Sequence, residues 1–77
     1  MTNNSAQQDV RLLQLDAIAE NLAMVSTFAA HGVDHAGYGD EAGLQASLFR
    51  AVKALNAALD TWRDLKAKVP EAARDAA

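Results

Sequence analysis

Apolar residues recur at helical spacing in two long segments of the chain, with a glycine-rich stretch between them. In the second segment they follow one another in steps of four and three residues, which is the spacing of a coiled-coil seam. That seam consists of Leu48, Val52, Leu55, Leu59 and Trp62. The spacing predicts one helix that buries a single face, with these side chains as core or dimer contacts.

The first segment differs, because its apolar residues form two stripes on nearly opposite sides of a helix. One stripe, predicted to supply core or dimer contacts, contains Leu15, Ile18, Leu22 and Val25. The other contains Val10, Leu13, Ala17, Met24 and Phe28. A helix that is apolar on two sides is usually buried on two sides, and one neighbouring helix covers only one of them. We therefore expect the second stripe to be covered by another molecule.

Capping residues and glycines predict where the first helix begins and ends. Ser5 and Gln8 fit a capping box, in which each side chain bonds a free backbone N–H of the other residue. A helix over about 5–30 follows. The stretch 31–40 holds three of the four glycines and is predicted to be a loop.

The second helix is predicted over about 41–68. Asp40 is a good N-cap, because its carboxylate can accept hydrogen bonds from the first turn. Pro70 ends the helix, since proline disfavours helical geometry at the preceding residue, and residues 69–77 are predicted to be a frayed tail. A loop of this length joining helices of similar length favours antiparallel neighbours, so residues 1–77 form a single all-α helical-hairpin domain.

The length of the chain bears on its oligomeric state. A domain of 77 residues supplies little core unless it is stapled or oligomeric, and the absence of cysteine excludes disulfides and thiolate metal sites. We therefore expect a homodimer, since twofold closure is the commonest symmetry. Two hairpins would form an antiparallel four-helix bundle.

Composition predicts the compartment. The first residues are polar and uncharged, and no stretch of about 18 apolar residues occurs, which predicts a cytoplasmic protein without membrane contact. The lack of cysteine suits a reducing compartment. An alanine-rich sequence is associated with bacteria of high GC content.

His31 and His35 are the first candidates for chemistry, because histidines four apart on a helix can share a zinc ion. Gly32 lies between them, and no third ligand stands at a diagnostic spacing. We therefore predict no metal, no cofactor and no catalytic residue, and hence no enzyme. A loop metal site at the two histidines is kept as an alternative.

Basic residues on the outer side of the second helix suggest a second alternative, nucleic-acid binding. They are Arg50, Lys53, Arg63 and Lys68. A dimer of hairpins is similar in architecture, though in no sequence motif, to the RNA-binding bundle of plasmid copy control. Asp60 and Asp64 interrupt the stripe, and the net charge of −3 disfavours a polyanion as the main partner.

Two aromatic residues lie outside the main stripes, Tyr38 in the predicted loop and Phe49 beside the seam of the second helix. Together with the second stripe of the first helix they are predicted to bind a partner, because aromatic residues and methionine are enriched at interface cores. The predicted function is a non-catalytic protein–protein interaction module: a small adaptor, regulator or inhibitor that acts as a homodimeric bundle.

Overall fold

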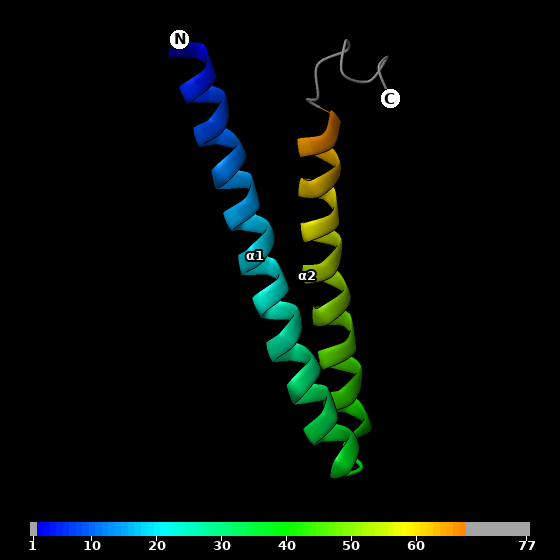
Figure 1. Cartoon of the computed structure of the whole chain (residues 1–77). Coiled ribbons are helices and arrows are strands. Elements are labelled where there is room, and N and C mark those ends of the chain that lie inside the picture. Colours follow the sequence, from blue (N-terminus) through cyan, green and yellow to red (C-terminus); the bar gives the residue numbers. More distant parts are fainter. Residues whose placement is uncertain (1, 68–77) are drawn as a thin grey trace.

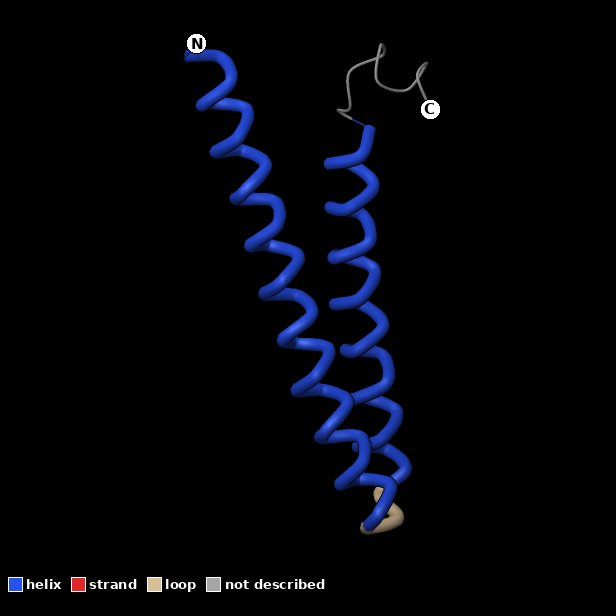
Figure 2. The backbone as a smooth tube through the Cα atoms, viewed as in Figure 1, coloured by secondary structure: helices blue, strands red, loops and turns tan. Residues whose placement is uncertain are grey.

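The computed structural model describes residues 2–67, and two long helices make up almost all of this part of the chain (Figure 1). Helix α1 spans Thr2–Gly37 and α2 spans Glu41–Ala67. The two helices run antiparallel and pack against each other (Figure 2). The predicted all-helical hairpin is confirmed for the described residues, and the predicted tail over 69–77 lies outside them.

Helix α1 continues to Gly37, so the prediction of a loop over 31–40 was wrong for its first seven residues. Gly32 explains the difference, because it is buried against α2 rather than exposed at a helix end. A Cβ atom added at Gly32 would lie 3.6 Å from Ser47 Cβ and 3.7 Å from Leu44 Cδ1. These are ordinary van der Waals distances, so Gly32 occupies a packing position inside the helix, where contact with α2 offsets the cost of about 1 kcal/mol that glycine imposes on a helix.

The connection between the helices is only three residues long, 38–40. Gly39 adopts a left-handed conformation with φ of 72°, which glycine tolerates without steric cost. Its N–H donates to Ala36 O at 3.1 Å, and the N–H of Asp40 donates to His35 O at 2.8 Å. These two bonds form a Schellman motif, which satisfies the last carbonyl groups of α1 within one turn.

The contact between the helices uses mostly small side chains on α2, with a leucine at each end of the row. The row with buried or half-buried side chains steps by three and four residues along the helix: Leu44, Ser47, Ala51, Ala54, Ala58, Thr61 and Leu65. The matching row on α1 contains Gln14, Ile18, Asn21, Val25, Phe28, Gly32 and His35. We call these two rows the hairpin interface. Small residues let two helix backbones approach closely, since the interaxial distance depends on the side chains at the contact.

The predicted seam of α2 is therefore not the contact with α1. Its five members, from Leu48 to Trp62, remain between 39% and 56% exposed in the single chain. They lie one position beyond the hairpin interface, on a flank that α1 does not cover.

Polar groups in the hairpin interface find hydrogen-bond partners. Gln14 Nε2 donates to Asp64 Oδ2 at 3.0 Å, which joins the two helices. Asn21 Nδ2 donates to Ala17 O at 3.2 Å on its own helix. Within the part of the chain that the structure describes, no buried side-chain nitrogen or oxygen lacks a partner. The interface thus carries polar residues without leaving a buried polar group unpaired.

Candidate functional site

The hairpin is a layer of two helices, and each stripe of α1 emerges on a different face of that layer. Helix α2 packs over the strip that separates the stripes, where Gln14 and Asn21 lie. Ile18 and Val25 from one stripe, and Phe28 from the other, are half-buried at its edges. The outer residues of each stripe stay exposed, so α2 leaves apolar side chains of α1 uncovered on both faces rather than on one.

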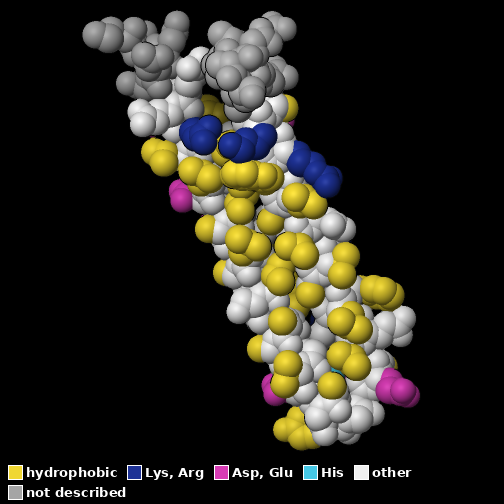
Figure 3. Space-filling model, turned by 45° about the vertical axis from the view of Figure 1, so that its right-hand side comes forward, with side chains coloured by type: hydrophobic (Ala, Val, Ile, Leu, Met, Phe, Trp, Pro, Cys, Tyr) yellow, Lys and Arg dark blue, Asp and Glu magenta, His cyan; other side chains and the backbone are white. Residues whose placement is uncertain are grey.

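One face carries large apolar side chains from both helices. They are Leu12, Leu15, Leu22 and Val33 of α1, and Leu48, Val52, Leu55, Leu59 and Trp62 of α2. We call this surface the leucine face. In α1, Leu15 and Leu22 each follow an interface residue by one position, and in α2 Leu55 does the same. In an antiparallel pair such positions fall on the same side, and Figure 3 shows hydrophobic side chains covering both helices along one face.

Charged residues border the leucine face at its two ends. Lys66 Nζ lies 4.8 Å from the centre of the Trp62 ring, a cation–π contact at the end away from the connection (Figure 1). Arg11 stands one helical turn before Leu15 at the same end, and Figure 3 shows Lys and Arg side chains gathered there. At the other end Glu41 precedes Leu48 by seven residues in the same row. The face is basic at one end and acidic at the other.

The opposite face carries a groove of about 350 Å³ between the helices, which we call the cationic groove. It is lined by Asn21, Met24 and Phe28 of α1 and by Arg50, Lys53, Ala54 and Ala57 of α2. Phe28 is fixed partly by His31, whose ring meets it edge-on with centres 6.5 Å apart. Most of the lining is apolar, and the two cations stand at its rim.

The structure separates the residues predicted to bind a partner. Met24 and Phe28 line the cationic groove, and Ala17 is half-buried nearby on the same stripe. Val10 and Leu13 continue the stripe towards the start of α1 and are exposed. Tyr38, 87% exposed on the connection, and Phe49, 65% exposed on the outer side of α2, do not line the groove.

The predicted core and dimer residues also divide into two groups. Ile18 and Val25 lie in the hairpin interface. The remaining members are on the leucine face: Leu15, Leu22, Leu48, Val52, Leu55, Leu59 and Trp62. The row of α2 that faces α1, which consists mostly of small residues, is the contact that the sequence pattern did not predict. Its signal was present in Ala51 and Ala58, seven residues apart on one line of the helix.

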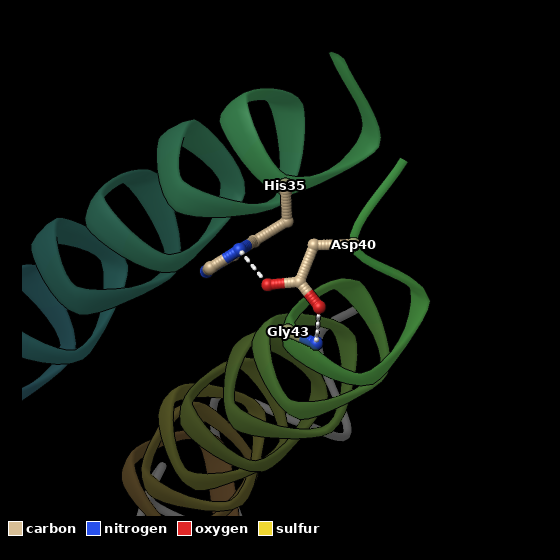
Figure 4. A network of polar contacts seen from close by, with 3 residues as sticks. All are labelled: His35, Asp40 and Gly43. Atoms are coloured by element: carbon tan, nitrogen blue, oxygen red, sulfur yellow. Dashed lines mark hydrogen bonds and ion pairs between the residues drawn. The ribbon is translucent and has the colours of Figure 1, made fainter. Parts of the chain in front are cut away.

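The two histidines have different contacts, since His31 meets Phe28 and His35 meets Asp40. His35 Nδ1 lies 3.0 Å from Asp40 Oδ2, while Asp40 Oδ1 accepts the N–H of Gly43 at 3.0 Å (Figure 4). The bond from Gly43, and then the contact with His35, hold the pKa of the Asp40 carboxyl below its usual value. Within residues 2–67, no group of three or more His, Asp or Glu side chains is placed to hold a metal ion.

The basic residues of α2 do not form one stripe. Arg50 and Lys53 stand together at the groove, whereas Arg63 lies 3.9 Å from Asp60 on its own helix. Lys68 lies outside the described residues. In residues 2–67 neither helix has the length of apolar sequence that crossing a bilayer demands.

Three comparisons with known proteins found no match. The chain matches no protein-family model, no curated protein and no solved structure.

Proposed function

We propose that this protein is a non-catalytic protein–protein interaction module that acts as a homodimeric helical bundle. The observation that supports the proposal is the leucine face, a continuous row of large apolar side chains contributed by both helices. Exposed apolar surfaces of this kind mark interaction sites in soluble proteins, because burying them is favourable by about 25 cal/mol per Å².

The occupant that we propose for the leucine face is a second copy of the chain. The face is a two-helix layer, and two such layers packed face to face form a four-helix bundle with the leucines inside. A twofold contact of this type is self-complementary, since the same patch serves both partners. It would also give the small domain a larger core than the hairpin interface supplies, since many side chains in that interface are small or polar.

The charges at the ends of the leucine face favour one orientation. If the hairpins pack head to tail, Lys66 of one copy meets Glu41 of the other. If they pack in the same direction, Lys66 meets Arg11 of the second copy. Exposed ion pairs are worth under about 1 kcal/mol each, so these charges select the orientation of the dimer and contribute little to its affinity.

The mass of the particle in solution tests the proposal. The chain has a mass of 8.2 kDa, and light scattering coupled to size exclusion should return twice that value. Leu55→Glu, at the middle of the leucine face, should yield a folded or partly folded monomer. Phe49→Glu is the matched control, because Phe49 is equally apolar and more exposed but lies off that face. A wild-type monomer at millimolar concentration, or a Leu55→Glu dimer, would overturn the proposal.

A further inference from the structure

The cationic groove lies on the face that the proposed dimer leaves open. Its floor is apolar and includes Met24 and Phe28. At its rim stand Arg50 and Lys53, three residues apart and hence on neighbouring turns of α2. Neither cation makes a hydrogen bond or an ion pair with any residue in the described range 2–67. An apolar floor beside two positive charges that have no direct ion pair is complementary to a ligand that is apolar in the middle and anionic at its edge.

We infer that the cationic groove binds an acidic amphipathic helix of a partner protein. Apolar side chains on one face of that helix would enter the groove, and Asp or Glu side chains one turn apart would pair with Arg50 and Lys53. The groove runs between two antiparallel helices, so a third helix can lie along it in the helix-in-groove mode. The inference rests on the proposed role as an interaction module, but it does not require the chain to be a dimer.

Charge and shape distinguish this occupant from the others. A nucleic acid would gain from only two cations here and would meet a lining that is mostly apolar. A basic helix would place like charges together at Arg50 and Lys53. A second copy of the chain would use the leucine face, where both helices expose large apolar side chains and no charged residue lies at the centre.

The test uses two synthetic peptides that differ only in charge. Both are labelled helices with leucine at every third or fourth position; one carries Glu beside the leucines and the other carries Lys. Fluorescence anisotropy should show the acidic peptide binding the full chain at least about tenfold more tightly than the basic one. Its affinity should fall as salt rises, because the ion pairs are exposed to screening.

Variants of the chain separate the groove from net charge. Arg50→Glu and Lys53→Glu should each weaken the acidic peptide by about tenfold, and together they should reverse the preference towards the basic peptide. Arg63→Glu is the matched control, since it makes the same change in charge away from the groove. Met24→Lys should also weaken binding, although it adds a cation, because it removes part of the apolar floor.

Three results would overturn the inference: equal binding of the two peptides, an equal loss with Arg63→Glu, or undiminished binding by Met24→Lys. Light scattering on the same samples keeps the two proposals apart. A monomer that binds the acidic peptide would refute the proposed dimer and support the proposed role of the groove. A dimer that binds neither peptide would support the dimer and refute the role of the groove. Circular dichroism on each variant establishes whether its helices are intact.

Discussion

His35 Nδ1 and Asp40 Oδ2 lie 3.0 Å apart. This contact joins the last turn of α1 to the residue that precedes α2. Because an ionised carboxylate only accepts hydrogen bonds, Nδ1 of His35 carries the proton that is shared. The other oxygen of Asp40 accepts the N–H of Gly43, which makes Asp40 the N-cap of α2. The backbone N–H of Asp40 completes the Schellman motif of α1. A single residue thus ends one helix and begins the next.

Replacing Asp40 should lower the stability of the hairpin. Asp40→Ala removes both carboxylate contacts and leaves first-turn N–H groups of α2 without a cap. Asp40→Asn keeps an acceptor for Gly43 and loses only the charge beside His35, so its effect should be smaller. Thermal unfolding followed by circular dichroism should rank the melting temperatures, from high to low, as wild type, Asp40→Asn and Asp40→Ala. Equal melting temperatures for all three would show that the cap contributes nothing.

The pH dependence of stability follows from the same carboxyl group. Its pKa is lowered in the folded chain, chiefly by the Gly43 N–H, so the folded state favours the ionised form. The stabilisation is therefore fully present above the unfolded pKa of about 4 and is lost as the pH falls through the lower, folded pKa. The melting temperatures of the wild type and Asp40→Asn should converge as the pH is lowered from neutral to strongly acidic. A gap that persists at the acidic end would contradict this assignment.

Gly43 should resist replacement, although it lies inside a helix. Alanine normally stabilises a helix by about 1 kcal/mol over glycine. At Gly43, however, an added Cβ would lie 2.5 Å from Asp40 Oδ2 and 2.6 Å from His35 Cε1. Gly43→Ala should therefore displace the His35–Asp40 contact and fail to stabilise. Gly37→Ala is the control, since a Cβ there meets nothing within 4 Å, and it should raise the melting temperature by a few degrees.

A double variant serves as the second control for Gly43. If the His35 ring is the obstacle, His35→Ala combined with Gly43→Ala should recover the helical gain that the single change lacks. Denaturant unfolding of the four proteins in this cycle measures the coupling between the two sites. Additive changes would show that the ring moves aside without cost.

The sequence predicted the two helices and the N-cap because those features are local. Asp40 caps α2 through a residue only three positions away, and periodicity alone indicates a helix. The end of α1 was missed, because Gly32 looks the same in sequence whether it breaks a helix or packs against Ser47. Only the partner helix decides between these roles, and its position is not a local property.

The choice of the hairpin interface was missed for a related reason. Apolar periodicity ranks leucine rows above alanine rows, since leucine buries more surface. In this chain Ala54 and Ala58 are buried in the hairpin interface, whereas the leucines of the predicted seam remain on an open face. The sequence did indicate that one neighbour would leave apolar residues of α1 uncovered, and Leu13 and Leu22 are both exposed. The pattern thus predicted that some apolar residues of α1 would stay uncovered. Which of them lie on each face of the hairpin depends on how the two helices pack, and the pattern does not show that.

Enlarging a residue of the hairpin interface should destabilise the chain even though it adds apolar surface. Ala58 is 4% exposed, so Ala58→Leu must push the helices apart or force a strained rotamer, at a cost of about 1–3 kcal/mol. Ala23→Leu adds the same side chain at an exposed position of α1 and should be close to neutral. Urea unfolding measures both free energies. A stabilising Ala58→Leu would show that the alanine row is not the hairpin contact.

The orientation of the proposed dimer can be determined with a single label at the connection. The chain has no cysteine, so Tyr38→Cys gives one site for a nitroxide, and Tyr38 is largely exposed. Head-to-tail packing would separate the two labels by about the length of α2, roughly 40 Å for its 27 residues. Packing in the same direction would bring the two labels within about half that distance. Double electron–electron resonance measures the distance between the labels and distinguishes the two values.

Charge reversal at the ends of the leucine face tests whether the charges of Glu41 and Lys66 determine the orientation of the dimer. Glu41→Lys should weaken the dimer or turn the hairpins, since the introduced ammonium group would face Lys66 of the other copy. Adding Lys66→Glu to the same chain restores opposite charges at both ends and should restore the long distance between the labels. Since two exposed pairs are involved, the expected change in dimer affinity is about three- to tenfold. A label distance that ignores both reversals would show that apolar packing alone sets the direction of the hairpins.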